Sequence, residues 1–329
     1  MSEARAVFDR LLPARLRVAR AASAYAPANI ALSKYWGKRD TALNLPQNSS
    51  LSISLGKWGT TTRVAPAAAD RLVFNEEELP ADAPAARKLW DFIALWRRDQ
   101  TLPLDIVTAN TIPTAAGLAS SASGFAALTR ALDEAFDLSL DAALLSQIAR
   151  FGSGSASRSL WHGFVRWNRG DAADGSDSFA VPLELRWPAF RIAIVPVDTG
   201  PKAQSSRDGM GHTLRTSPLY ATWPVQAEAD CAAMAAAIMA QDFAALGPLA
   251  EANALAMHAT MMAARPALTY LKPASWAVLE RVWGARADGA AIYATMDAGA
   301  NVKLIFLADA LDAVASAFPE AEVIAPFRD

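Results

Sequence analysis

The sequence predicts an α+β protein with two domains. Its 329 residues are enough for about two domains, and a composition with 53% hydrophobic and 19% charged residues is typical of chains that form packed cores. Strand-like and helix-like apolar spacings alternate along both halves of the chain. A proline-bracketed segment, 182–188, separates the halves and predicts a boundary between residues 1–185 and residues 186–329.

The first half alternates predicted strands and helices. Apolar and polar residues alternate over 51–75, whereas Phe125, Leu128 and Leu132 recur at helical spacing after a loop of small residues. The predicted elements, in order, are strands over 51–75, a turn at 75–79, a helix over 82–98, a strand over 104–108, helices over 122–136 and 140–151, and a strand pair through Val165 and Phe179.

The second half begins with an apolar run over 190–197, which predicts a strand. Two or three long helices are expected within 218–286. Two further apolar runs, 290–295 and 302–307, predict strands on either side of a turn that contains Asp297. This order favours an α+β domain with antiparallel strands.

Charge and cysteine content narrow the functional classes. The 31 basic and 33 acidic residues give a net charge of −2, which argues against a protein that coats nucleic acid or an anionic membrane. We therefore expect no nucleic-acid partner and no membrane partner. The single cysteine, Cys231, cannot form an intramolecular disulfide, which favours a reducing, cytoplasmic compartment.

Several common catalytic motifs are absent from the sequence. There is no G-x-x-x-x-G-K-[ST] loop, no complete G-x-G-x-x-G, no H-E-x-x-H and no G-x-S-x-G. The three histidines are widely separated, which argues against a histidine and cysteine metal centre. Any bound metal should therefore be a hard cation with oxygen ligands.

Two small-residue loops predict anion binding. Residues 113–124 combine glycine, alanine and serine before a helix, so backbone N–H groups there could cradle a polyanion. Residues 152–158 offer hydroxyls and amides, followed by the guanidinium of Arg158. The alternatives are a helix cap that serves only packing and a flexible serine-capped turn.

Three further segments carry charged candidates. Lys34 and Lys38 are four residues apart, on what could be one helical face, although a solvated charged turn is the commoner explanation. Residues 202–210 add two cations and could equally be a solvated loop. Asp297 lies between two apolar strands, where a lone carboxylate is either a turn former or a functional acid.

Together, in this order, these segments resemble the diphosphomevalonate decarboxylase family of the GHMP kinase superfamily. The resemblance covers Tyr25 to about Leu307. Its most specific parts are Ala26-Pro-Ala-Asn-Ile-Ala with Lys34-Tyr-Trp-Gly-Lys-Arg-Asp, the loop 113–121, residues 152–158, the segment Asn253-Ala-Leu-Ala-Met-His258, and Met296-Asp-Ala-Gly.

The resemblance implies a two-domain GHMP kinase fold, with a ribosomal-protein-S5-like N-terminal domain and a ferredoxin-like C-terminal domain around the active site. It also implies ATP and Mg²⁺ as cofactors and a homodimer. The implied reaction is phosphorylation of the 3-hydroxyl of mevalonate 5-diphosphate by ATP, followed by loss of phosphate and CO2 to give isopentenyl diphosphate.

The resemblance also implies roles for individual residues. Asp297 would orient or deprotonate the 3-hydroxyl, Lys34 would stabilise developing charge, and Arg158 would hold the substrate carboxylate. The residues expected to bind the substrate diphosphate are Tyr35, Lys38, Ser153, Ser155, Ser206 and Arg207. Those expected at the nucleotide are Gly117, Leu118, Ala119, Ser120, Ser121 and Ala122, with Ser120 or Ser121 nearest Mg²⁺, and Lys202 as a weaker candidate.

Alternatives within the same fold remain open at this stage. A decarboxylase of the monophosphate or a mevalonate 3-kinase would keep the same architecture, and a non-catalytic ligand-binding descendant is a further alternative from another functional class. Trp161 and His162 stand where smaller residues often follow the serine loop, so we expect them to reshape the pocket near the diphosphate. The first 20 residues lie outside the resemblance.

Overall fold

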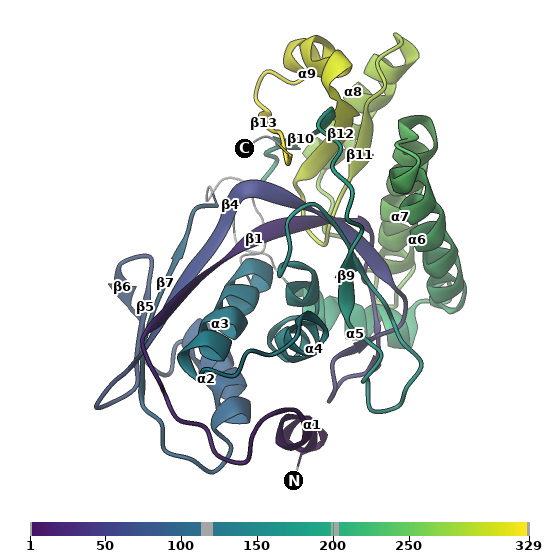
Figure 1. The fold of residues 1–329 in the computed structure, drawn as a ribbon. Coiled ribbons are helices and arrows are strands. Elements are labelled where there is room, and N and C mark those ends of the chain that lie inside the picture. Colours follow the sequence, from purple (N-terminus) through teal and green to yellow (C-terminus); the bar gives the residue numbers. More distant parts are fainter. Residues whose placement is uncertain (1, 113–120, 199, 201–203, 328–329) are drawn as a thin grey trace.

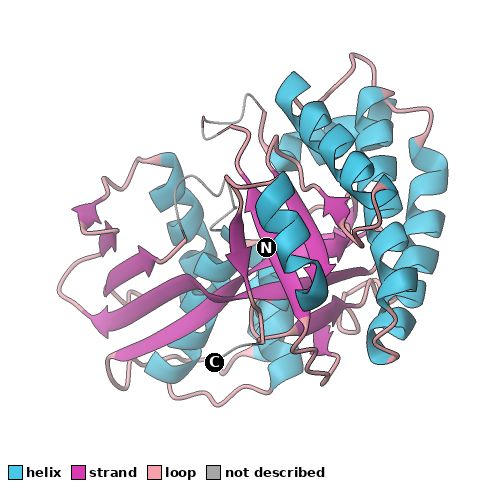
Figure 2. Cartoon of the chain, turned by 90° about the horizontal axis from the view of Figure 1, so that it is seen from above, coloured by secondary structure: helices cyan, strands magenta, loops and turns pink. Residues whose placement is uncertain are grey.

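A computed structural model describes residues 2–112, 121–198, 200 and 204–327. The chain forms two main β-sheets, each packed against its own helices (Figure 1). Viewed from above, one group of helices lies to one side of the strands, and other helices lie beneath the strands (Figure 2). No helix among the described residues is long and apolar enough to cross a membrane.

The first sheet has seven strands, in the order β6-β5-β7-β4-β8-β9, with β1 also paired to β4. Every pair is antiparallel except β5 with β7. The longest strands are β1 and β4, which run antiparallel along most of the domain. The strands are β1 (Ala22–Ser33), β4 (Ser50–Pro66), β5 (Arg71–Phe74), β6 (Glu77–Glu78), β7 (Leu104–Asn110), β8 (Phe164–Trp167) and β9 (Ala180–Pro182).

A short two-stranded ribbon and four α-helices complete the first half. The helices bury apolar residues against one face of the sheet, with an aromatic cluster that includes Phe8, Trp96 and Phe125. The Asp141 side chain caps α4 by accepting a hydrogen bond from the Leu144 backbone. The elements are α1 (Glu3–Leu11), β2 (Lys38–Asp40), β3 (Leu45–Pro46), α2 (Pro84–Arg97), α3 (Ser121–Ala135), α4 (Ala142–Gly152) and the 3₁₀ helix η2 (Gly154–Arg158).

The second sheet has four antiparallel strands in the order β11-β12-β10-β13. The strands are β10 (Phe190–Val195), β11 (Tyr293–Thr295), β12 (Val302–Leu307) and β13 (Glu322–Ile324). The helices are α5 (Ser206–Thr216), η3 (Tyr220–Thr222), α6 (Trp223–Met239), α7 (Phe243–Met262), α8 (Pro273–Ala287), η4 (Ala308–Ala310) and α9 (Leu311–Ala317).

The two halves share a continuous apolar core. Ile30 of β1 and Ile53 of β4 belong to the same buried cluster as Ile192 and Ile194 of β10. This packing brings the end of β1 next to the turn between β11 and β12. We propose the division between residues 185 and 186 as the domain boundary, and it lies in the connection from β9 to β10.

Most of the predicted elements are confirmed, within a few residues at their ends. The helices predicted over 82–98, 122–136 and 140–151 correspond to α2, α3 and α4. The interpretation of 202–210 as a solvated loop is wrong from residue 206 onwards, because Ser206 begins α5 and the Ser205 side chain caps that helix. Among the described elements, the prediction missed α1, β1, β2, β3, α5, α9 and β13.

Candidate active site

A cavity of about 140 Å³ lies between the two halves of the chain. The first half lines it with the end of β1, η2 and the start of α3, and the second half with α5, α7, the β11–β12 turn and β12. Most of the side chains predicted for catalysis lie here, together with Ala122 of the predicted phosphate loop. The predicted residues that line it are Lys34, Tyr35, Ser155, Arg158, Ser206 and Asp297.

Lys34 and Asp297 form a close ion pair in this cavity. The Lys34 Nζ donates to Asp297 Oδ1 at 2.9 Å and to the carbonyl oxygen of Ala31 at 2.7 Å. Lys34 is only 1% exposed. Burial therefore lowers the pKa of Lys34 to about 8, although the Asp297 carboxylate opposes that shift. Lys34 is therefore mostly protonated at neutral pH and loses its proton as the pH rises through about 8.

Helix α7 supports both members of this pair. The Asn253 side-chain oxygen accepts the backbone N–H of Lys34 at 2.8 Å, and its amide donates to Asp230 of α6 at 2.8 Å. One turn further on, the His258 Nε2 lies 3.2 Å from the carbonyl oxygen of Asp297. Burial lowers the pKa of His258 to about 4, so the ring is neutral and its Nε2–H is the donor. Helix α7 thus fixes the backbone at both residues.

Lys303 is a second lysine at the same carboxylate, and it is absent from the residues predicted from sequence. Its Nζ lies 3.5 Å from Asp297 Oδ2, the oxygen that does not bind Lys34. Lys303 is 2% exposed and lines the cavity. A single lysine in the apolar run Val302-Lys-Leu-Ile-Phe-Leu is the sequence signal that could have identified it.

Arg158 is a third buried cation of the cavity, with 2% of its surface exposed. Its Nη1 donates to the Ser50 hydroxyl, while its Nε has no hydrogen-bond partner among the described atoms. Burial lowers the pKa of Arg158 to about 10, and the Asp297 carboxylate opposes the shift. The guanidinium therefore stays charged at neutral pH and keeps N–H donors for an anionic ligand.

A neighbouring cavity of about 500 Å³ contains the other predicted cations, Lys38 and Arg207. Met210 of α5 lines both cavities, so they are adjacent. Burial lowers the pKa of Lys38 to about 8, and the positive charges of Arg207 and Lys88 lower it further. Cations that destabilise one another in this way favour the binding of a multiply charged anion.

Tyr35 and two serines lie close to these cations. The Tyr35 ring packs edge-on against Trp167 with centroids 5.0 Å apart, and burial raises the pKa of its hydroxyl. That hydroxyl is buried without a protein partner among the described atoms. The Ser153 and Ser155 hydroxyls lie 3.3 Å apart at the start of η2, where Ser153 is the N-cap. These groups can supply neutral donors beside the charged ones.

The predicted nucleotide residues are only partly described. Gly117, Leu118, Ala119, Ser120 and Lys202 lie outside the described residues. Ser121 and Ala122 form the first turn of α3, and the N-terminus of a helix is a position that attracts anions.

An apolar slot of about 160 Å³ adjoins this helix and was not predicted from sequence. Leu72, Leu89, Phe125 and Leu128 line its wall, with the Asn110 side chain among the polar groups. Its volume and apolar lining suit a planar heteroaromatic ring.

No group of three histidine, cysteine, aspartate or glutamate side chains within the described ranges could hold a metal ion. The Ser121 hydroxyl, in the first turn of α3, is an oxygen donor that suits Mg²⁺, which usually keeps waters and binds phosphates as well. The residues present therefore fit a magnesium ion that is held mainly by a nucleotide.

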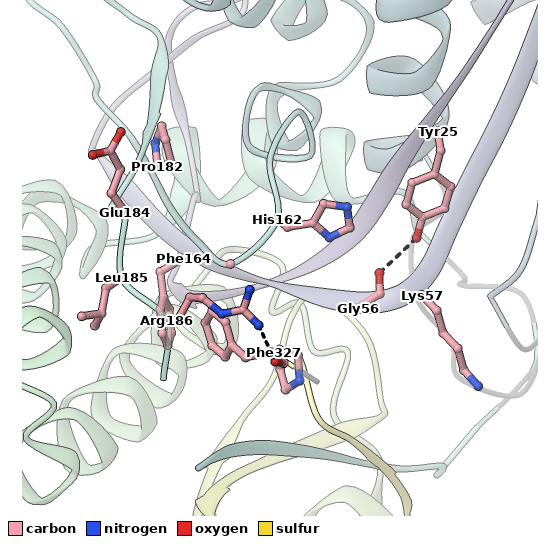
Figure 3. Close-up of a pocket in the computed structure, with 12 residues that line it drawn as sticks. Tyr25, Gly56, Lys57, His162, Phe164, Pro182, Glu184, Leu185, Arg186 and Phe327 are labelled. Atoms are coloured by element: carbon pink, nitrogen blue, oxygen red, sulfur yellow. Dashed lines mark hydrogen bonds between the residues drawn. The ribbon is translucent and has the colours of Figure 1, made fainter. Parts of the chain in front are cut away.

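Two expectations about position are wrong. Lys34 and Lys38 do not share a helical face, because Lys34 follows β1, Gly37 turns the chain with φ at 119°, and Lys38 begins β2. His162 does not line the substrate cavity. Its ring stacks on Tyr25, with centroids 6.0 Å apart, in a separate cavity of about 660 Å³ (Figure 3).

Comparison with protein-family models identifies both halves of the chain. Residues 26–180 match the diphosphomevalonate decarboxylase-like N-terminal domain, and residues 192–325 match the mevalonate 5-diphosphate decarboxylase C-terminal domain. The chain is also 40% identical over 311 residues to a diphosphomevalonate decarboxylase of Aspergillus fumigatus, which covers 87% of this chain and 76% of the relative.

Solved structures show the same similarity in three dimensions. The mevalonate diphosphate decarboxylase from Staphylococcus aureus superposes with a TM-score of 0.86 at 37% identity, covering 93% of this chain and 95% of that one. A second solved structure is the protein MDDEF in complex with MVAPP, AMPPCP and magnesium. It superposes with a TM-score of 0.85 at 38% identity and covers 93% of this chain and 98% of that one.

Proposed function

The chain belongs to the diphosphomevalonate decarboxylase family, and on that basis we propose how its residues carry out the ATP-dependent decarboxylation of mevalonate 5-diphosphate. The product is isopentenyl diphosphate, with ADP, phosphate and CO2 released. The observation that carries the assignment is the cavity in which Lys34, Arg158 and Asp297 meet next to a second cationic cavity.

Each of the two cavities binds a different anionic group of the substrate. Arg158 holds the substrate carboxylate, because a guanidinium with free N–H groups binds a carboxylate through two parallel hydrogen bonds. Lys38 and Arg207 bind the diphosphate in the larger cavity. Neutral donors complete the diphosphate site, and we assign this role to Tyr35, Ser153, Ser155 and Ser206.

Asp297 orients the 3-hydroxyl for phosphoryl transfer. The 3-O–P bond forms as the bond between the γ-phosphorus of ATP and its bridging oxygen breaks, and ADP leaves with that electron pair. The 3-O–H bond breaks, and its proton passes to Asp297 or to a phosphoryl oxygen. Asp297 accepts the hydrogen bond from the hydroxyl, either as a base or as an orienting carboxylate, because a loose transition state requires little proton abstraction. Lys34 keeps Asp297 in place and offsets the charge that develops.

The second step releases phosphate and CO2. The C3–O bond breaks with its electron pair on the departing phosphate, and the electron pair of the bond to the carboxylate forms the new C=C bond. A tertiary hydroxyl is a poor leaving group and phosphate is a good one, which explains the need for ATP. The cations of the cavity stabilise the phosphate as it departs.

We place the nucleotide at the start of α3. Residues 117–122 would cradle its phosphates, with Ser120 or Ser121 nearest Mg²⁺ and Lys202 as a further phosphate contact. When bound, Mg²⁺ would neutralise charge on the phosphates. The apolar slot beside α3 would take the adenine, and Lys88, which lines that slot and lies 4.8 Å from the Phe125 ring centre, would face the phosphates. MDDEF binds AMPPCP and magnesium together, which supports this pair of ligands.

The assignment is tested by offering the purified protein mevalonate, its 5-phosphate or its 5-diphosphate with ATP and Mg²⁺, and measuring ADP and CO2 separately. Equal amounts of ADP and CO2 from the 5-diphosphate alone are expected. Equal amounts from the 5-phosphate would change the substrate assignment, and ADP without CO2 would indicate a 3-kinase. The absence of both products would indicate a non-catalytic protein.

Assembly and location are also part of the proposal. We expect a homodimer, because Trp276 and Trp283 leave 38% and 37% of their surface exposed on one helix, α8. Light scattering on the purified protein measures the mass directly. We also propose a cytoplasmic location, because the single cysteine, Cys231, is a free, buried thiol and the chain therefore has no intramolecular disulfide.

A further inference from the structure

Lys303 occupies a position where a lysine needs a functional explanation. It lies in β12, opposite Ile194 of β10 and Thr295 of β11, in the middle of the second sheet. Its neighbours Val302 and Leu304 point into the apolar core of the C-terminal half. Lys303 points to the opposite face, because successive side chains in a strand alternate. It lines the active-site cavity from that face.

The cavity contains more positive than negative charge. Lys34, Arg158 and Lys303 are each about 98–99% buried, and Asp297 is the carboxylate that faces all three. These four groups carry a formal charge of +2. Buried charges without partners are costly, so the excess indicates that anionic ligand groups complete the site.

Of Lys34 and Lys303, it is Lys303 that has the weaker hydrogen bonds within the described part of the protein. Lys34 already donates two short hydrogen bonds, to Asp297 and to Ala31. The contacts of Lys303 among the described residues are long, at 3.4 Å to the carbonyl oxygen of Asn301 and 3.5 Å to Asp297 Oδ2. An ammonium with three donors and only long contacts can bind a phosphoryl oxygen without losing a strong partner.

We propose that Lys303 is a catalytic residue that binds the phosphoryl group as it moves from ATP to the 3-oxygen and as it leaves as phosphate. This proposal rests on the function proposed above. Arg158 is assigned to the substrate carboxylate, and Lys38 and Arg207 to the diphosphate. Among the described cations around Asp297, Lys34 is held by two short hydrogen bonds and Arg158 is assigned to the carboxylate, so we assign Lys303 to the third anionic group of the reaction. Its position at Asp297 Oδ2 places it beside the carboxylate that orients the attacking hydroxyl.

The test compares Lys303→Met, Lys303→Gln and Lys303→Arg with the unaltered protein. Methionine keeps the length and apolar stem of lysine without its charge, glutamine keeps a donor, and arginine keeps the charge. Lys57→Met is the matched control, because Lys57 is an exposed lysine that lines a different cavity. Circular dichroism and thermal melting establish that each variant is folded.

Turnover and transition-state binding are then measured separately. We expect Lys303→Met to lower kcat for ADP release by about 10²-fold. The KM values for ATP and for mevalonate 5-diphosphate (MVAPP) should change less than about threefold. Lys303→Arg should recover part of the loss in kcat. MgADP with aluminium fluoride and MVAPP mimics the phosphoryl group in transfer. Its affinity should fall by a similar factor in Lys303→Met, while the affinity for MgADP alone should not change.

The outcomes distinguish the inference from the proposed function. An unaltered protein that releases no ADP from MVAPP and ATP would overturn the proposed function, and the inference with it. An active unaltered protein, with Lys303→Met within about threefold in kcat and in aluminium fluoride affinity, would overturn the inference alone. If Lys303→Met and Lys303→Gln both fail to fold, the role of Lys303 is structural and the inference is also wrong.

Discussion

Substrate binding should be accompanied by proton uptake near pH 8. The pKa values of Lys34 and Lys38 are both lowered to about 8, mainly by burial. An anion placed beside each ammonium favours its charged form and raises its pKa. Both lysines therefore bind protons when MVAPP binds. The test compares pH 7 with pH 8, and the unaltered protein with the Lys38→Met variant.

The size of the uptake follows from these values. At a pH equal to its pKa a group is half protonated, so two lysines should take up about one proton per MVAPP at pH 8 and about 0.2 at pH 7. Lys38→Met should leave about half of the uptake at pH 8, since Lys34 remains. The affinity for MVAPP should also fall, because one phosphate contact is lost.

Isothermal titration calorimetry measures this uptake directly. MVAPP is titrated into the protein at pH 8 in buffers with different ionisation enthalpies, and the slope of binding enthalpy against ionisation enthalpy gives the number of protons. Lys57→Met serves as the control and should match the unaltered protein. A slope of zero at pH 8 would show that MVAPP places no anionic group beside Lys34 or Lys38. The same slope in Lys38→Met would refute the assignment of Lys38 to the diphosphate.

Three further substitutions test the roles of Asp297 and Arg158 and the packing of α1. Asp297→Asn should lower kcat by about 10²–10⁴-fold with MVAPP affinity almost unchanged, and rapid-quench measurement of a near-normal rate would show that Asp297 does not act on the hydroxyl. Arg158→Lys keeps the charge but loses the planar fork, so kcat/KM for MVAPP should fall by about 10–100-fold; a change below threefold in steady-state assays would place the carboxylate elsewhere. Phe8→Ala removes a fully buried ring that packs 5.2 Å from Phe151. It should lower the free energy of unfolding by about 3–5 kcal/mol, and a loss below about 1 kcal/mol in urea denaturation would show that α1 is loosely attached.

The elements that were predictable from sequence are those with strong local patterns. Helix α3 was predictable because Phe125, Leu128 and Leu132 recur at helical spacing and are buried together in the core. Helix α5 was missed because its sequence contains two glycines and few apolar residues. Its stability depends on tertiary contacts, such as Tyr270 donating to the carbonyl oxygen of its N-cap, Ser205.

The candidate site was only partly predictable, for a related reason. The loops around Arg158 and Asp297 have recognisable local composition, whereas the pairing of Asp297 with Lys34 joins residues 263 positions apart. Lys303 could not be placed from sequence, because only the register of β11 with β12 brings its side chain beside Asp297. The spacing of Lys34 and Lys38 was misleading, because the turn at Gly37 directs them into different cavities.

We propose that each cation around Asp297 binds a different anionic group of the substrate or the nucleotide. A crystal structure of this protein with MVAPP, AMPPCP and magnesium tests it most directly. We expect the substrate carboxylate on Arg158, the 3-hydroxyl within hydrogen-bond distance of Asp297, and the terminal phosphonate of AMPPCP on Lys303. A complex with the diphosphate on Arg158 and Lys303, or with the 3-hydroxyl away from Asp297, would contradict the account.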